Sequence, residues 1–196
     1  MMYSFKIFRY SICVAACNPL FFSRYCCARK ISSMSVDAVR TYLDQWGRGG
    51  DVMEFPVSSA TVELAALALK TQPARIAKTL SFATAEGCLL IVTAGDARID
   101  NKLFKAEFGM KARMLDAERA LLLTGHAVGG VCPFALTSGN VEVYADVSLK
   151  RFTTVFPACG SANSAIEVTP EQLGHYAGIY RWVDVCSNWK EPSHTT

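Results

Sequence analysis

Apolar residues recur at helical spacing in several short segments of the chain. Val36, Val39, Leu43 and Trp46 lie three to four residues apart, with Ser35 as a candidate N-cap. Gly47 is expected to end this helix. Five more helices are predicted, over residues 61–70, 73–78, 100–108, 116–123 and after the capping box Thr169-Pro170-Glu171-Gln172.

Other segments have the patterns of β-strands. Residues 88–94 form a continuous apolar run, typical of a strand buried on both faces, and residues 141–147 alternate like a half-buried strand. Shorter strands are expected at residues 52–57, 79–84, 152–156, 165–168 and 180–185. Because strands and helices mix without strict βαβ alternation, we predict one α/β (α+β) domain built on a mixed, curved sheet.

The first 33 residues differ in composition from the rest. They carry five basic residues and no acidic one, and their apolar run, residues 12–22, is too short to span a bilayer. This segment is interpreted as an organellar transit peptide or as an over-extended start before Met34, with a secretory signal as a weaker alternative. The predicted domain therefore covers residues 34–189, followed by a flexible tail over residues 190–196.

Charge and cysteine usage narrow the classes of function. Residues 34–196 contain 15 basic and 17 acidic residues, so a tight grip on a long duplex is not expected, although a local basic patch is allowed. The eight cysteines include no C-x-x-C pair, and the chain has only three histidines. We therefore expect no metal, no cofactor and no membrane partner. A reducing compartment is indicated: the cytoplasm, or the mitochondrion if residues 1–33 are a transit peptide.

Three segments carry candidate chemistry. Lys78 is expected where a helix meets a strand, and its ammonium could hold a phosphate or polarise an ester carbonyl, or be a solvated helix-end lysine. The loop from Gly129 to Phe134 contains adjacent glycines, which let several N–H groups converge on an anionic oxygen, or form an ordinary tight connection. Asp146 at a strand end and the turn Gly160-Ser161 could contact a substrate, or act as a strand-end cap and a β-turn.

Cys132 lies in the glycine loop, and His126 could serve as its base in a cysteine hydrolase or transferase. The sequence around Cys132 has no signature of such a family, and a buried structural thiol is the favoured interpretation. The two interpretations stay open at this point.

The segments resemble the YbaK/ProX family of aminoacyl-tRNA deacylases, which is related to the editing domain of bacterial-type prolyl-tRNA synthetases. The resemblance covers residues 35–185 and rests on the order and spacing of five motifs. They are Ile76-Ala-Lys78-Thr-Leu-Ser-Phe82, Asp100-Asn-Lys-Leu-Phe104, Val128-Gly-Gly-Val-Cys-Pro-Phe134, Tyr144-Ala-Asp146-Val-Ser-Leu149 and Gly160-Ser-Ala-Asn163.

The resemblance implies a mixed sheet, partly barrel-like, with a pocket for the aminoacyl end of tRNA. It implies catalytic roles for Lys78 and Gly130, with backbone amides of the loop stabilising an oxyanion. Implied substrate-binding residues are Gly129, Val131, Cys132, Pro133, Phe134, Asp146, Gly160 and Ser161. Ala135 replaces a glycine that many members carry, which leaves specificity open.

The implied activity is hydrolysis of a small amino acid, such as alanine, cysteine, serine or threonine, from mischarged tRNA, with tRNA-Pro the expected carrier. An aminoacyl-tRNA synthetase is a further candidate partner. The alternative is a non-catalytic module that binds tRNA or a synthetase.

Overall fold

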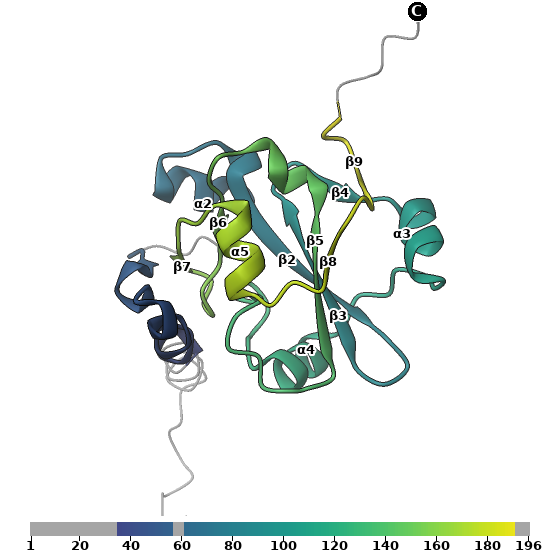
Figure 1. Ribbon diagram of the computed structural model, residues 1–196, viewed down its shortest axis with the longest axis horizontal. Coiled ribbons are helices and arrows are strands. Elements are labelled where there is room, and N and C mark those ends of the chain that lie inside the picture. The colour runs from purple at the N-terminus through teal and green to yellow at the C-terminus, as the bar shows by residue number, and fades with distance from the viewer. Residues whose placement is uncertain (1–34, 57–60, 191–196) are drawn as a thin grey trace, which may run out of the picture.

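The computed structural model describes residues 35–56 and 61–190. Its centre is a five-stranded mixed sheet in which only β2 and β3 pair in antiparallel fashion (Figure 1). In spatial order the strands are β6 (Phe156–Pro157), β2 (Ile76–Ala83), β3 (Cys88–Ala94), β5 (Val141–Asp146) and β8 (Arg181–Val183). Two further two-stranded sheets pair β1 (Met53–Glu54) with β7 (Ser164–Ala165), and β4 (Arg98–Ile99) with β9 (Cys186–Ser187). The prediction of a mixed α/β architecture is confirmed.

The predicted caps at Asp116 and in the Thr169 capping box are confirmed, and Thr61 and Asp100 cap two further helices. Residues 35–43 are helical and continue into η1 (Asp44–Trp46), which ends at Gly47. Thr61, Asp100, Asp116 and Thr169 each accept a hydrogen bond from a main-chain N–H of the helix that follows. These helices are α2 (Val62–Leu69), α3 (Asn101–Phe108), α4 (Ala117–Thr124) and α5 (Pro170–Tyr176). Short 3₁₀ turns complete the set: η2 (Gly49–Asp51), η3 (Pro73–Arg75) and η4 (Val147–Arg151).

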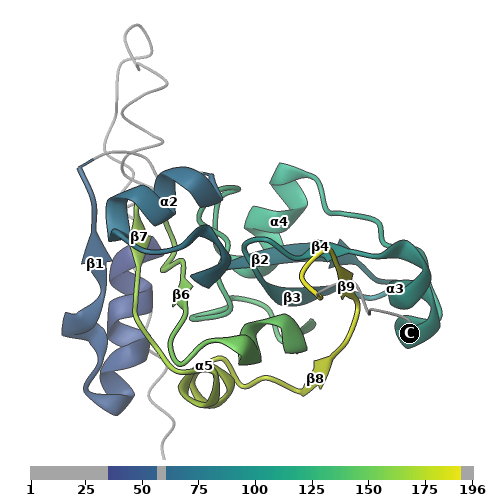
Figure 2. The same cartoon turned by 90° about the horizontal axis from the view of Figure 1, so that it is seen from above.

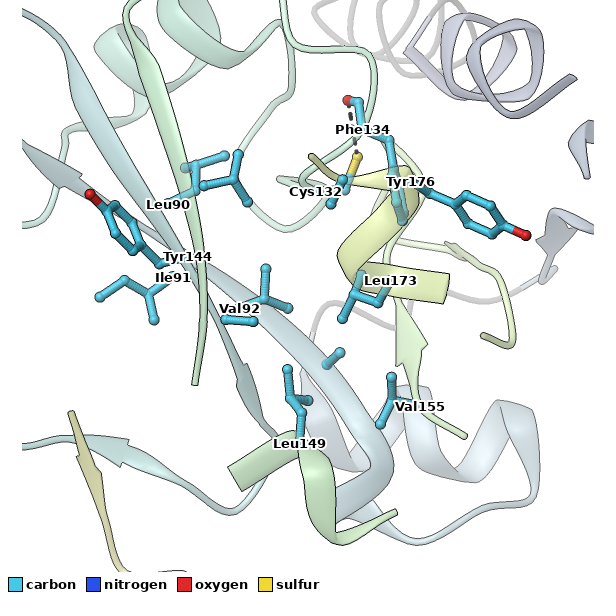
Figure 3. Packing of buried hydrophobic residues seen from close by; sticks show 14 of the residues in the cluster. Leu90, Ile91, Val92, Cys132, Phe134, Tyr144, Leu149, Val155, Leu173 and Tyr176 are labelled. Carbon is cyan, nitrogen blue, oxygen red and sulfur yellow. Dashed lines mark hydrogen bonds between the residues drawn. The ribbon is translucent and has the colours of Figure 1, made fainter. Parts of the chain in front are cut away.

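The core lies on both faces of β3. All seven residues of β3 are buried, as the apolar run predicted. Figure 3 shows Ile91 beside Tyr144 and Val92 on the side of Leu173, which comes from α5. Figure 2 shows α2 and α4 on one side of β2 and β3, and α5 on the other. The sheet is therefore covered on two sides, and its ends and edges are left to form sites.

The segment around Lys78 differs from the prediction. A helix was expected over residues 73–78, but only the 3₁₀ turn η3 forms before β2 begins at Ile76. Ile76 and Ala77 pair in parallel with Phe156 and Pro157, so tertiary pairing outweighs the local helical signal of Pro73. Lys78 is thus the third residue of a strand and does not lie at a helix end.

Four other expectations need correction. Residues 143–146 are all buried because β5 lies between β3 and β8, so no half-buried alternation is seen. The strand expected at residues 152–156 shrinks to Phe156–Pro157, and that at residues 180–185 to Arg181–Val183. Ser35 lies inside the first helix, and its hydroxyl contacts His126 Nδ1 at 2.6 Å. The expectations for residues 1–33 and 191–196 fall outside the described residues.

Candidate functional site

A cavity of about 290 Å³ opens at the edge of β2. One wall is the face of α2 that carries Val62, Ala65 and Leu69. The opposite wall comes from the glycine loop and from the segment between β6 and β7. The floor is formed by β2, and every residue from 76 to 81 lines the cavity. Apolar side chains predominate, so the cavity suits a small group with few charges.

Lys78 supplies the charged group of this lining. Its Nζ donates to the carbonyl oxygens of Gly95 at 3.1 Å and Ala97 at 2.5 Å. An ammonium has three N–H donors, so one remains for a substrate oxygen. Burial is the main cause that lowers the pKa of Lys78, with smaller opposing contributions from Cys186 and Asp96. The amine is held in place by the turn after β3, and Lys78 lines the cavity.

The glycine loop and the 160–161 turn pack directly on each other. A Cβ added to Gly130 would lie 2.6 Å from Ser161 Cα and 2.7 Å from Ser161 N, so no larger residue fits without movement. Gly129 and Gly160 have φ angles of +93° and +88°, a region that glycine adopts without strain. Gly129, Val131 and Ser161 line the cavity, Gly130 sets the distance between the two backbone segments, and Gly160 lies against the main chain of Ser35 in the first helix.

Asp146 has a structural environment in this fold. Its side chain is fully buried, and its carboxylate accepts hydrogen bonds from the main-chain N–H groups of Ser148 and Val185, both at 2.9 Å. These bonds start η4 and hold the chain that follows β8. Asp146 is absent from the cavity lining, and the structure does not bring it into contact with Lys78.

Cys132, Pro133 and Phe134 are buried and absent from the cavity lining, and Cys132 and Phe134 belong to the hydrophobic core. Cys132 Sγ lies 3.3 Å from His126 Nε2 and 3.7 Å from the Phe134 carbonyl oxygen (Figure 3 shows the latter contact). Burial raises the pKa of Cys132 to about 12 and lowers the pKa of His126. A buried thiol of this kind stays protonated near neutral pH, which argues against a nucleophilic role.

Several lining residues were missed from the sequence. Val62, Ala65 and Leu69 lie at helical spacing on one face of α2, a signal that could have identified them as a wall. Met114 is 60% exposed at the rim, and no sequence pattern marks it. Thr79 lines the floor, and its Oγ1 is buried without a hydrogen-bond partner among the described residues.

Metal-binding and membrane-spanning features are both absent from residues 35–56 and 61–190. No group of three or more His, Cys, Asp or Glu side chains within these residues could hold a metal ion. No helix of this part of the chain has the length and apolar character that a membrane span requires.

The chain is similar to several known proteins. Residues 57–175 match the family model described as an aminoacyl-tRNA editing domain. The uncharacterized protein YwhH of Bacillus subtilis (strain 168) is 55% identical over 158 residues, which cover 80% of this chain and all of YwhH.

Solved structures show the same fold. One, from work on epitope backbone grafting onto scaffold proteins, has a TM-score of 0.73 at 27% identity and covers 79% of this chain and 99% of its own. A second is a candidate trans-editing enzyme for prolyl tRNA synthetase, with a TM-score of 0.69 at 28% identity, covering 81% of this chain and 98% of its own. A family match over most of the described domain, with a relative matched along its full length, shows that the chain belongs to the family of aminoacyl-tRNA editing domains.

Proposed function

We propose that this protein is a trans-editing deacylase that hydrolyses the ester bond between a small amino acid and the terminal ribose of mischarged tRNA. The observation that carries the proposal is the cavity where Lys78 meets the glycine loop. Family membership and the candidate trans-editing enzyme among the structural neighbours support it. Water attacks the ester carbonyl, the acyl C–O bond to the ribose breaks, and the free amino acid and tRNA leave.

Lys78 and the glycine loop supply electrostatic stabilisation in this mechanism. The free N–H of the Lys78 ammonium binds the carbonyl oxygen or the terminal phosphate of the substrate. The Gly130 N–H donates to the Ala127 carbonyl oxygen at 2.9 Å, so the main-chain N–H groups of Gly129 and Val131, which line the cavity, bind the negative charge that develops on the oxygen. Preorganised donors of this kind contribute roughly 10²–10³-fold to the rate.

The cavity lining provides no general base among the described residues. It contains no His, Asp, Glu, Cys or Tyr side chain. The neighbouring ribose hydroxyl of the substrate, or the thiol when the amino acid is cysteine, therefore assists the attacking water. The apolar walls and the Lys78 charge favour small neutral side chains and disfavour basic ones.

The rim next to the cavity suits the phosphates of a tRNA acceptor end. Arg113 and Arg119 line a hollow that shares Met114 and Leu115 with the cavity, and both arginines are exposed. Neither forms an ion pair within the part of the chain that the structure describes. Two unpaired guanidinium groups give a local basic footprint on a nearly neutral domain.

The test is a panel of mischarged tRNAs, beginning with Ala-, Cys-, Ser- and Thr-tRNA-Pro and including correctly charged Pro-tRNA-Pro. We expect one or more of the small residues to be released rapidly while Pro-tRNA-Pro survives. Binding of these tRNAs without hydrolysis of any of them would favour the non-catalytic binding module instead.

A further inference from the structure

The outer edge of β2 is paired at both ends and open in the middle. At its start, Ala77 pairs with Pro157 of β6, and this ladder stops there. Towards its end, the carbonyl oxygen of Ser81 accepts from the N–H of Leu115 at 3.0 Å. Thr79 lies between these two points and lines the cavity.

The main-chain groups of Thr79 point into this gap. In a β-strand the N–H and C=O groups of one residue point toward the same edge of the strand, and those of the next residue point toward the opposite edge. Ser81 C=O and Ala83 N–H both bond outward, away from β3. The register of β2 with β3 runs unbroken from Ala77 to Ala83, so the alternation is preserved. Thr79 therefore presents a donor and an acceptor outward, and no described strand or loop pairs with them.

The side chain of Thr79 is also unsatisfied. Its Oγ1 is buried and has no hydrogen-bond partner among the described residues. A buried polar atom left in this state costs free energy unless a ligand or a solvent molecule supplies the missing bond. The N–H and C=O of Thr79 thus lie at the open edge of β2 beside the cavity, and its buried Oγ1 adds a third unsatisfied polar group to the same residue.

We propose that Thr79 binds the α-aminoacyl group of the substrate as a one-residue strand partner. This inference rests on the proposed function and names the subsite within it. Directly opposed residues of an antiparallel pair exchange two hydrogen bonds, each through its own N–H and C=O. An aminoacyl ester carries the same pair, an α-amine and a carbonyl on one carbon atom, and so completes the edge by β-augmentation.

The chemistry of the lining agrees with this assignment. The Thr79 N–H donates to the ester carbonyl, and the Thr79 C=O and Oγ1 accept from the α-amine. The cavity has no carboxylate among its described lining residues, so neutral acceptors must hold the amine. Recognition through main-chain groups selects the α-amino acid backbone, and the apolar walls then act on the side chain.

The test uses two stable amide analogues of an aminoacylated adenosine, one with an alanyl group and one with a propionyl group that lacks only the α-amine. Dissociation constants are measured by calorimetry for the wild type and for Thr79→Val, Thr79→Ser and Thr79→Pro. We expect the wild type to prefer the alanyl analogue by about tenfold or more. Thr79→Val should lose much of this preference, whereas Thr79→Ser, which keeps the hydroxyl, should retain it.

Thr79→Pro removes the outward N–H without removing a ladder bond, because proline is tolerated where the N–H faces away from the sheet. This variant should bind both analogues more weakly than the wild type does. Equal affinity of the wild type for the two analogues would overturn the proposal, even if a variant failed to fold. A preference that survives both Thr79→Val and Thr79→Pro would overturn it as well.

A parallel hydrolysis assay separates this inference from the proposed function. Selective alanyl binding with no hydrolysis of any aminoacyl-tRNA would leave the Thr79 subsite standing and contradict the deacylase. Hydrolysis of an aminoacyl-tRNA, together with equal binding of the alanyl and propionyl analogues, would support the deacylase and contradict the Thr79 subsite.

Discussion

At the scale of single residues, burial decides which groups can react. Lys78 keeps a free donor at the cavity because two main-chain carbonyls hold its Nζ in place. Cys132 and His126 are close enough for a nucleophile and base, yet both are buried and neither lines the cavity. Their burial therefore argues against a nucleophile and base pair that proximity alone would suggest.

The buried thiol gives a direct prediction. Cys132→Ala should leave deacylation within about threefold of the wild type, because the Cys132 thiol does not line the cavity and its pKa of about 12 keeps it protonated. Thiol alkylation under native conditions should be slow at Cys132. Loss of activity on alkylation of Cys132, with Cys132→Ser equally inactive, would instead support the cysteine hydrolase.

His126 links pH to stability. The ring lies between Ser35 Oγ at 2.6 Å and the Phe134 carbonyl oxygen at 2.7 Å, and burial lowers its pKa. Above about pH 6.5 the ring is neutral in both the folded and the unfolded state. As the pH falls below this value, the unfolded chain takes up a proton that the folded state resists, so the free energy of unfolding decreases.

Urea unfolding between about pH 7 and pH 5 measures this effect. His126→Asn should be less stable at neutral pH, by about 1–3 kcal/mol for the buried hydrogen bonds, and should lose less stability on acidification. An unchanged pH dependence in His126→Asn would contradict the assignment.

At the scale of elements, the site depends on two loops packed without side chains between them. The glycine loop and the 160–161 turn meet at Gly130, where a Cβ would lie within 3 Å of the opposing backbone. The segment after this turn is anchored beside β1 through Phe55, which exchanges 2.8 Å hydrogen bonds with Asn163. The walls of the cavity are therefore positioned by interactions between segments far apart in the chain.

Gly130→Ala tests this packing. The added methyl group must push the two backbone segments apart, so we expect a loss of about 1–3 kcal/mol in stability and a severe loss of deacylation. Gly139→Ala is the matched control, because nothing lies within 4 Å of a Cβ there. Thermal unfolding and single-turnover hydrolysis would show the difference, and equal behaviour of the two variants would contradict this packing role.

The elements that could be predicted from the sequence carry their own local signals. The capped helices α2 to α5 and the apolar strand β3 need only spacing and capping residues to be recognised. The two-residue strands β4, β6 and β9 form only through partners distant in sequence, and no local pattern distinguishes them. Likewise, Lys78 and the glycine loop could be identified as candidates, but the open edge at Thr79 depends on where β6 stops.

At the scale of the whole molecule, a nearly neutral domain presents a small basic rim beside an apolar cavity. Under the proposed function, such a surface would bind the end of a tRNA and not a long duplex, since it neutralises few phosphates. The exposed residues Met114 and Val128 lie at the same rim, where unpaired bases could contact apolar side chains.

Salt dependence reports on this rim. Arg113→Ala and Arg119→Ala should each weaken tRNA binding. The plot of the logarithm of the association constant against the logarithm of the salt concentration should become less steep, by about 1 for each phosphate that the variant no longer neutralises. Lys102→Ala on α3, outside the cavity lining, should change neither the affinity nor the slope. Slopes equal to that of the wild type in both arginine variants would place the tRNA on another surface.

The most direct test of the central claim compares wild type with Lys78→Met in single-turnover hydrolysis of the best mischarged tRNA. Methionine keeps an apolar stem but removes the ammonium, and Lys102→Ala serves as the surface control. We predict a loss of about 10²-fold or more in rate for Lys78→Met, in a variant that still shows cooperative unfolding. A folded Lys78→Met protein that hydrolyses the tRNA at the wild-type rate would contradict the account.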